Sequence, residues 1–391
     1  MRTAFLTLGA QSGVTAGVIR GFQSMGHHVD EVNPTDVLLL RKPGTRLPRL
    51  TPRVLFHLAA SAYRFGTQHM SHRWNTPFAF DVHSRRAGTL LSRLPEPPDV
   101  VLQSGALFAP GTPPRHPYVL LCDNTCSIAE RQPAASDAEI GAHVSYCEAW
   151  LRRERATYSG ASGIAVFSEV VRASLIHDYG ISPERITVVR AGANIAPTEV
   201  ERHHDGRSLL FIGKGSFGHK GGRVLLRAFR RLREKYRDLR LTLIGPTEPL
   251  ELPDGVTNLG LQPFDRVAES LRKATVFVLP TLREPFGIAF LDAMASAVPC
   301  VGTHVGAIPE ILGGVAGLTV APADDEALAA ALSSLLADPA RATAMGLAGR
   351  RRVLENGYLW PAVVRRLEAV VASARSEATA PWAARLRLSA A

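Results

Sequence analysis

The sequence predicts an α/β protein of two doubly wound parallel-sheet domains, and three observations point to this fold class. Short β-branched or leucine-rich runs alternate with longer helical patterns along the chain, which is typical of βαβ units. A polar, non-periodic segment at 198–206 interrupts the alternation, and a second series of strands follows it. The length of 391 residues suits two domains of roughly 100–200 residues each.

Each predicted domain takes its strands from short apolar runs. The expected strands are Thr3–Leu8, His28–Val32, Asp99–Gln103, Tyr118–Cys122, Gly163–Phe167 and Ile186–Arg190, then Ser208–Ile212, Leu239–Ile244, Ala274–Leu279, Pro299–Val301 and Leu318–Val320. Helices are expected at Asp324–Ala337, Pro339–Leu354 and Trp360–Ala374. We therefore place one domain at residues 1–200 and another at 201–359, with residues 360–391 packing back on the first. Parallel sheets bind ligands beyond the carboxyl ends of their strands, so the cleft between the domains is the expected active site.

Composition excludes several classes of protein. Hydrophobic residues make up 46% and charged residues 20%, which argues against long-range disorder, coiled coil and collagen. The four cysteines lack CxxC spacing, which argues against a disulfide framework and a structural zinc. No apolar run reaches the ~18 residues of a membrane span, and the run at Met1–Leu8 is too short for a signal peptide. We expect a cytoplasmic protein.

The net charge of +10 is concentrated in the first half of the chain. Between Arg41 and Arg93 there are ten Lys or Arg and one acid, Asp81, around apolar runs such as Val54–Ala60. This basic amphipathic stretch suits peripheral contact with anionic lipid at the inner membrane face, or an acidic acceptor. A second cluster between Arg223 and Arg240 is interpreted as a solvated helix face. Nucleic acid is not expected, because recognition-helix motifs and interleaved aromatic residues are missing.

A glycine-rich loop opens the second domain at residues 213–222, directly after a strand. It contains a literal GxGxxG, but the next strand ends without the acid that would hold a dinucleotide ribose. The chain has five lysines, and two of them, Lys214 and Lys220, lie in this loop. Two ammonium groups, flexible glycines and a helix N-terminus predict a diphosphate site.

A second motif, Leu279–Met294, is also a strand, a loop and a helix start. Its acids Glu284 and Asp292 are eight positions apart, which is about 12 Å in a helix. Glycosidase carboxylates are roughly 5–9.5 Å apart, so these acids are interpreted as grips on the two ends of an extended ligand. Backbone amides of Phe286, Gly287 and Ile288 follow Glu284 and suit an anion or a sugar hydroxyl.

With these motifs and the run Val301–Glu310, the block from Ser208 to Trp360 resembles the C-terminal domain of the retaining family 4 glycosyltransferases of GT-B fold. The first half is similar more weakly, at Gly9–Gly13 and Ile186–Asn194. The resemblance implies a metal-independent enzyme without a cofactor, whose substrate is a nucleoside-diphosphate sugar, UDP- or GDP-sugar above all. For the donor, it implies that Lys214 and Lys220 contact the diphosphate and that Gly13 faces the distal phosphate. The sugar would be bound by Glu284 and the amides of Phe286, Gly287 and Ile288. The ribose would be bound by Asp292, and the base would lie against Leu261.

The chain departs from the family pattern at three places. Asp292 is one methylene shorter than the family's Glu, and the phosphate loop is one residue longer between Lys214 and Lys220. Where many members carry a histidine on the catalytic side, this chain has Asp123 in the run Leu121–Thr125. Asp123 is either its catalytic substitute or an Asx cap of the next helix.

The resemblance implies transfer with retained configuration, in which the leaving diphosphate deprotonates the acceptor hydroxyl. The acceptor is expected to be lipid-linked, a saccharide or a natural product. Two alternatives stay open: a GT-B epimerase or hydrolase acting on the nucleotide sugar, and a non-catalytic sugar-nucleotide-binding scaffold.

Overall fold

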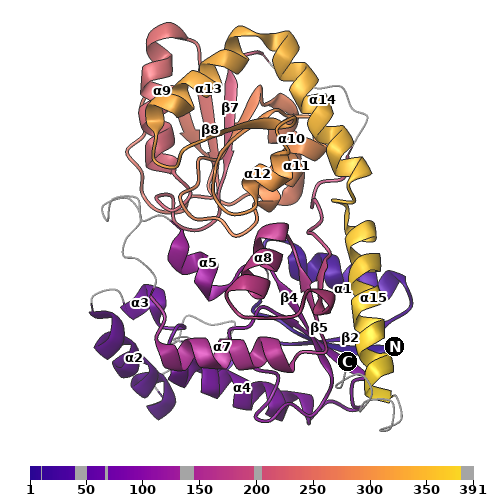
Figure 1. The fold of residues 1–391 in the computed structure, drawn as a ribbon. Helices are drawn as coiled ribbons and strands as arrows, with labels where there is room; N and C mark the ends of the chain where they lie inside the picture. Colours follow the sequence, from indigo (N-terminus) through magenta and orange to yellow (C-terminus); the bar gives the residue numbers. More distant parts are fainter. Residues whose placement is uncertain (10, 40–50, 67–68, 133–144, 198–204, 380–391) are drawn as a thin grey trace. The chain divides into compact units, whose positions relative to one another are not determined.

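The computed structural model describes residues 1–9, 11–39, 51–66, 69–132, 145–197 and 205–379. It divides into two compact units, the first formed by Met1–Glu130, Val144–Val189 and Val364–Ala391, the second by Arg131–His143 and Arg190–Val363. Each unit contains a six-stranded parallel sheet with helices around it (Figure 1). The predicted α/β fold with two parallel sheets is therefore confirmed.

The first unit has the strand order β2-β1-β3-β4-β5-β6. Its strands are β1 Arg2–Leu6, β2 His28–Val32, β3 Val100–Ser104, β4 Tyr118–Cys122, β5 Gly163–Val166 and β6 Ile186–Val188. Its helices are α1 Val14–Ser24, α2 Pro52–Phe65, α3 His69–His72, α4 Pro77–Leu91, α5 Cys126–Arg131, α7 Glu148–Gly160 and α8 Glu169–His177. Every residue of β3 and β4 is buried, because helices cover both faces of a parallel sheet. This explains why these strands are apolar throughout.

The second unit has the strand order β12-β11-β10-β7-β8-β9. Its strands are β7 Ser208–Ile212, β8 Arg240–Ile244, β9 Val256–Asn258, β10 Val276–Val278, β11 Cys300–Thr303 and β12 Gly317–Val320. Its helices are α9 Gly222–Lys235, α10 Phe264–Lys273, α11 Ile288–Ala295, α12 Ile308–Leu312, α13 Asp325–Ala337 and α14 Pro339–Glu355. Counted within the unit, this is the 3-2-1-4-5-6 order, whose direction reverses between β7 and β10.

The expected strands all appear within a few residues of their predicted bounds, and one strand was missed. β9 has three residues at the sheet edge and no apolar run to announce it. Asp324 and Asp338 cap α13 and α14 through the amides of Ala327 and Arg341. The predicted polar segment at 198–206 lies mostly outside the described residues, as does the end of the predicted 360–391 region.

The final helix, α15 Trp360–Thr379, continues from the second unit into the first. From Val364 onward it contacts the first unit: a side chain at Gly21 would overlap Val364, and Arg366 Nε donates to Val189 O at 3.0 Å. Glu368 lies 3.5 Å from His27 Nε2. Helix α15 therefore contacts both helix α1 and the end of β6.

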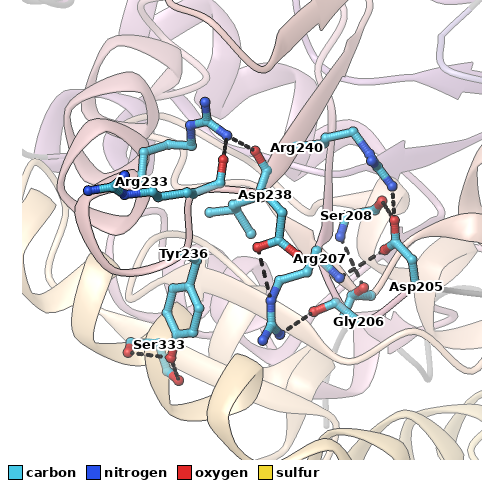
Figure 2. A network of polar contacts seen from close by, with 12 residues as sticks. Asp205, Gly206, Arg207, Ser208, Arg233, Tyr236, Asp238, Arg240 and Ser333 are labelled. Atoms are coloured by element: carbon cyan, nitrogen blue, oxygen red, sulfur yellow. Dashed lines mark hydrogen bonds and ion pairs between the residues drawn. The ribbon is translucent and has the colours of Figure 1, made fainter.

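The arginines around α9 take part in a network that the interpretation as a solvated face missed. Arg227 and Arg231 each bond Asp325 at 3.0 Å. Near the amino ends of β7 and β8, Arg207 lies 3.5 Å from Asp238 and Arg240 pairs with Asp205 (Figure 2). The pairs of Arg207 and Arg240 thus lie at the opposite end of β7 and β8 from the glycine-rich loop that carries Lys214 and Lys220.

Candidate active site

The centre of the candidate site is an ion pair where β7 and β10 end. Lys220 Nζ lies 2.6 Å from Glu284 Oε2, and their side chains are 21% and 11% exposed. Lys220 comes from the loop after β7 and Glu284 from the loop after β10. These adjacent strands flank the point where the strand order reverses, which is where open α/β sheets bind ligands. The structure thus brings together the central residues of the two predicted motifs.

Backbone contacts hold the two loops against each other. His219 O accepts hydrogen bonds from Thr281 Oγ1 at 3.1 Å and from Leu282 N at 2.9 Å. Gly221 precedes α9 with φ of 72°, and a Cβ there would overlap Pro280 O. Two reasons therefore require glycine at position 221: its left-handed backbone and the close approach of the Pro280 carbonyl.

Helix α11 begins beside this pair. Gly287 has φ of 102° and precedes Ile288, the first helical residue, while Phe286 is buried. The first amides of a helix have no intrahelical acceptor. That the amides of Phe286, Gly287 and Ile288 bind a ligand stays a prediction. On the other side, a Cβ at Gly306 would overlap Glu284 O, which shows how closely the loop after β11 approaches.

Lys214 and Leu261 lie on the exposed side of the same edge. Lys214 is exposed, and no ion pair to it is found within the described ranges. Leu261 is 59% exposed and follows Gly260, whose carbonyl accepts from Gly245 N at 2.8 Å. A Cβ at Gly245 would in turn overlap Gly213 O. The loop carrying Leu261 is thus joined through the end of β8 to the start of the phosphate loop.

Asp292 is buried in α11 and anchors another segment of the chain. Its Oδ1 accepts hydrogen bonds from Asn194 N at 2.6 Å and Ile195 N at 3.0 Å. Burial raises the pKa of the Asp292 carboxyl to about 7, against the lowering effect of the Ile195 and Asn194 amides. Trp360 Nε1 donates to Asn194 Oδ1 at 3.3 Å. The expected ribose contact of Asp292 stays a prediction; the contacts observed fix the 194–195 backbone.

In the first unit, Gly13 and Asp123 follow β1 and β4. Gly13 has φ of 88° and caps α1, and Ser104 Oγ donates to Gln11 Oε1 at 2.6 Å across the β1–β3 reversal of strand order. Asp123 is exposed after β4. Thr125 Oγ1 accepts the Ile128 amide at 3.1 Å, so Thr125 has the capping contact that we considered for Asp123.

Two contributors to the site were missed in the sequence. Glu248 Oε1 accepts the Phe217 amide at 2.9 Å and so orients the phosphate loop. Thr303 Oγ1 donates to Thr281 O at 2.7 Å and links the ends of β11 and β10. Both are polar residues at or soon after the end of an apolar strand, a signal that is too common to select them.

Comparison with known proteins identifies the second unit. Residues 206–338 match the model of the family described as Glycosyl transferases group 1. We call these residues the group 1 domain; they contain β7 to α13, with both Lys220 and Glu284. The resemblance to glycosyltransferases is thereby confirmed, whereas family 4 and retention of configuration stay predictions.

Relatives and solved structures extend the comparison. The chain is 33% identical over 219 residues to MMP alpha-(1->4)-mannosyltransferase of Mycolicibacterium hassiacum, covering 52% of each chain. The match thus spans about half the length of that curated relative. Sucrose-phosphate synthase of Thermosynechococcus elongatus is 19% identical with a TM-score of 0.71, covering 95% of this chain and 98% of that one. WaaG, a glycosyltransferase involved in lipopolysaccharide biosynthesis, is 17% identical with a TM-score of 0.67, covering 94% and 99%. The predicted GT-B fold class is confirmed.

The described part of the chain contains no group of three or more His, Cys, Asp or Glu residues suited to a metal ion. Among the helices described, none combines the length and apolar character needed to cross a bilayer. Whether the reaction is independent of metal stays a prediction.

Proposed function

We propose that the protein is a retaining glycosyltransferase that moves a sugar from a nucleoside-diphosphate sugar to an acceptor hydroxyl without a metal ion. The observation that carries the proposal is the Lys220–Glu284 pair at the reversal point of the group 1 domain. In a nucleotide sugar the phosphate oxygen is bonded directly to the sugar. A cation beside a carboxylate can therefore bind both sides of the bond that breaks, the cation binding the phosphate and the carboxylate binding the sugar.

The proposed reaction follows from these charges. The bond between the anomeric carbon and the diphosphate oxygen breaks, and the acceptor oxygen bonds to that carbon on the same face. The acceptor proton passes to the leaving diphosphate. Lys220, Lys214 and the start of α11 stabilise the negative charge that develops on the leaving group, as preorganised donors do. Glu284 accepts a hydrogen bond from a sugar hydroxyl.

The donor contacts in the second unit come from the same edge of the sheet. We assign the amides of Phe286, Gly287 and Ile288 to the sugar, Asp292 to the ribose and Leu261 to the base. UDP- and GDP-sugars are the proposed donors. In the first unit we assign Gly13 to the distal phosphate and Asp123 to the acceptor side.

The acceptor is proposed to be lipid-linked or a saccharide, with a natural product as the alternative. Two similar proteins support this choice, a mannosyltransferase and a glycosyltransferase involved in lipopolysaccharide biosynthesis. A cytoplasmic enzyme acting peripherally at the inner membrane face fits such an acceptor.

Release of nucleoside diphosphate tests the proposal. The full chain is incubated with UDP-, GDP-, ADP- and TDP-sugars and pooled acceptors, with and without EDTA. We expect acceptor-dependent release from one donor, unchanged by EDTA, and a product whose anomeric NMR coupling equals that of the donor. Release without acceptor would indicate a hydrolase, and binding without release a scaffold. An inverted product or loss of activity with EDTA would overturn the proposed mechanism.

A further inference from the structure

Helix α2 exposes several large apolar side chains and buries two polar ones. Leu55, Phe56 and Tyr63 are 52%, 58% and 96% exposed, whereas His57 and Ser61 are fully buried. At 100° per residue, Leu55, Ala59, Tyr63 and Phe56 fall within an arc of about 100° on the outer face. We call these four residues the α2 ridge. A helix that faced only water would carry polar residues there.

The inner face of α2 is held in the first unit by aromatic packing. His57 lies beside Trp74, with ring centroids 5.4 Å apart, and burial lowers the pKa of His57 to about 4. Thr51 Oγ1 caps the helix through Val54 N at 3.3 Å. Phe56 touches Phe78 at one ring edge, with centroids 4.7 Å apart, and leaves the rest of its ring exposed. The orientation of the ridge is therefore fixed by the packing beneath it.

The charged side chains of α2 are of one sign. Between Asp36 and Asp81 the sequence has seven Lys or Arg and no acid, and four of the seven, at positions 41–49, lie outside the described residues. Arg53 and Arg64 are exposed on α2 itself, on one flank of the ridge. Asp81, the next acid along the sequence, is paired with Arg153 at 2.7 Å. No ion pair of Arg53 or Arg64 is found within the described residues, so positive charge borders one flank of the ridge.

We propose that the α2 ridge docks on the surface of an anionic lipid bilayer, with its apolar side chains at the level of the acyl boundary and Arg53 and Arg64 on the headgroups. Aliphatic and aromatic side chains in one arc with flanking cations are typical of helices that lie in the membrane interface. A second copy of this chain is disfavoured, because a two-fold contact would bring the basic borders together. This surface is distinct from the Lys220–Glu284 site, and the docking does not depend on sugar transfer.

Vesicle sedimentation tests the docking. The full chain is mixed with phosphatidylcholine vesicles with and without phosphatidylglycerol, at low and high salt. We expect binding to the anionic vesicles only, weakened by salt because exposed charges are screened. The double variant Leu55→Glu/Phe56→Glu is expected to bind at least about tenfold more weakly, and Arg53→Gln/Arg64→Gln several-fold more weakly.

The control is Leu347→Glu on α14, because Leu347 is 46% exposed against 52% for Leu55. Its binding should equal that of the wild type. Circular dichroism of each variant shows that folding is retained, since the replaced side chains are exposed. Equal binding to neutral vesicles, equal loss with Leu347→Glu, or concentration-dependent dimerisation that Leu55→Glu/Phe56→Glu abolishes would overturn the proposal. The vesicle assay contains no sugar donor, so a protein that does not bind vesicles could still be the proposed transferase. In the same way, a protein that turns over no donor could still bind vesicles.

Discussion

The two units are built on similar parallel sheets but use them differently. At the reversal point of the second unit, loops from β7 and β10 bring Lys220 to 2.6 Å from Glu284. At the corresponding point of the first unit, Gln11 and Ser104 make an uncharged hydrogen bond, and the unusual features lie on α2. The family model matches within the second unit only. Under our proposals, the second unit supplies most donor contacts, while the first supplies the acceptor side and the membrane contact.

The largest expected effect distinguishes two glycines with left-handed backbones, one in each unit. Gly221 has φ of 72° and Gly26 has φ of 79°. An alanine at Gly26 meets nothing within 4 Å, so Gly26→Ala should cost only about 1–2 kcal/mol of backbone strain. Gly221→Ala also overlaps Pro280 O and should cost more than about 4 kcal/mol. Urea unfolding of the full chain, with limited proteolysis to show which unit opens, measures both. Equal losses would show that the β7 and β10 loops are not closely joined.

Replacing Lys220 tests the charged reversal point directly. We expect Lys220→Ala to lower kcat about 10²–10³-fold, as loss of a preorganised donor to a developing anion does. The matched control is Lys273→Ala on α10, where Lys273 is exposed and paired with Glu269. Because Lys220→Ala leaves Glu284 without its counter-ion, Lys220→Met/Glu284→Gln serves as a second variant that is folded and inactive. Normal kcat in both Lys220 variants would remove Lys220 from the mechanism.

The sequence predicted the sheets better than the contacts between their loops. Apolar runs such as Tyr118–Cys122 mark buried strands because a parallel sheet excludes polar residues from both faces. The loops meet through backbone atoms, chiefly His219 O, and every residue has a carbonyl. Motif spacing therefore placed Lys220 and Glu284 at one edge without showing that they form a pair.

Two other features needed the folded chain. The amides that bind Asp292 belong to Asn194 and Ile195, almost a hundred positions away, and no local pattern indicates such a contact. In α2 the apolar positions cover much of the helix, so the pattern alone does not say that His57 and Ser61 face inward. That orientation depends on Trp74 and the other aromatic side chains packed beneath the helix.

Buried titratable groups should give the units opposite responses to pH. In the second unit, the pKa of Asp292 is raised from 3.8 to about 7, so the folded state binds the proton more tightly and loses stability as pH rises from about 4 to 7. Asp292→Asn should therefore gain about 2–4 kcal/mol relative to the wild type between pH 4.5 and 8. Unfolding curves of both proteins across this range measure the difference. If the difference in unfolding free energy between the variant and the wild type stayed constant, Asp292 would be ionised throughout the range from pH 4.5 to 8.

In the first unit, burial lowers the pKa of His83 from 6.5 to about 4, with a smaller effect of His57. The unfolded state then binds the proton more tightly, so this unit loses stability as pH falls from about 6.5 to 4. His83→Phe should reduce that acid sensitivity, because phenylalanine does not bind a proton. The variant keeps an aromatic ring beside Trp74, whose ring centroid lies 5.3 Å from that of His83. Proteolysis at pH 5 compared with pH 7 reports which unit opens. An unchanged acid response in His83→Phe would assign it to other groups, such as His57.

The smallest effect is expected where the first unit would contribute to the chemistry. Asp123 is exposed after β4, and we have proposed that it lies on the acceptor side. Asp123→Asn should lower kcat about tenfold, a loss near 1.4 kcal/mol, and leave the donor KM unchanged. Glu96→Gln is the control, since Glu96 is an exposed acid of the same unit, paired with Arg2. If Asp123→Asn raised the donor KM with kcat unchanged, Asp123 would belong to the donor contacts and not to the acceptor side.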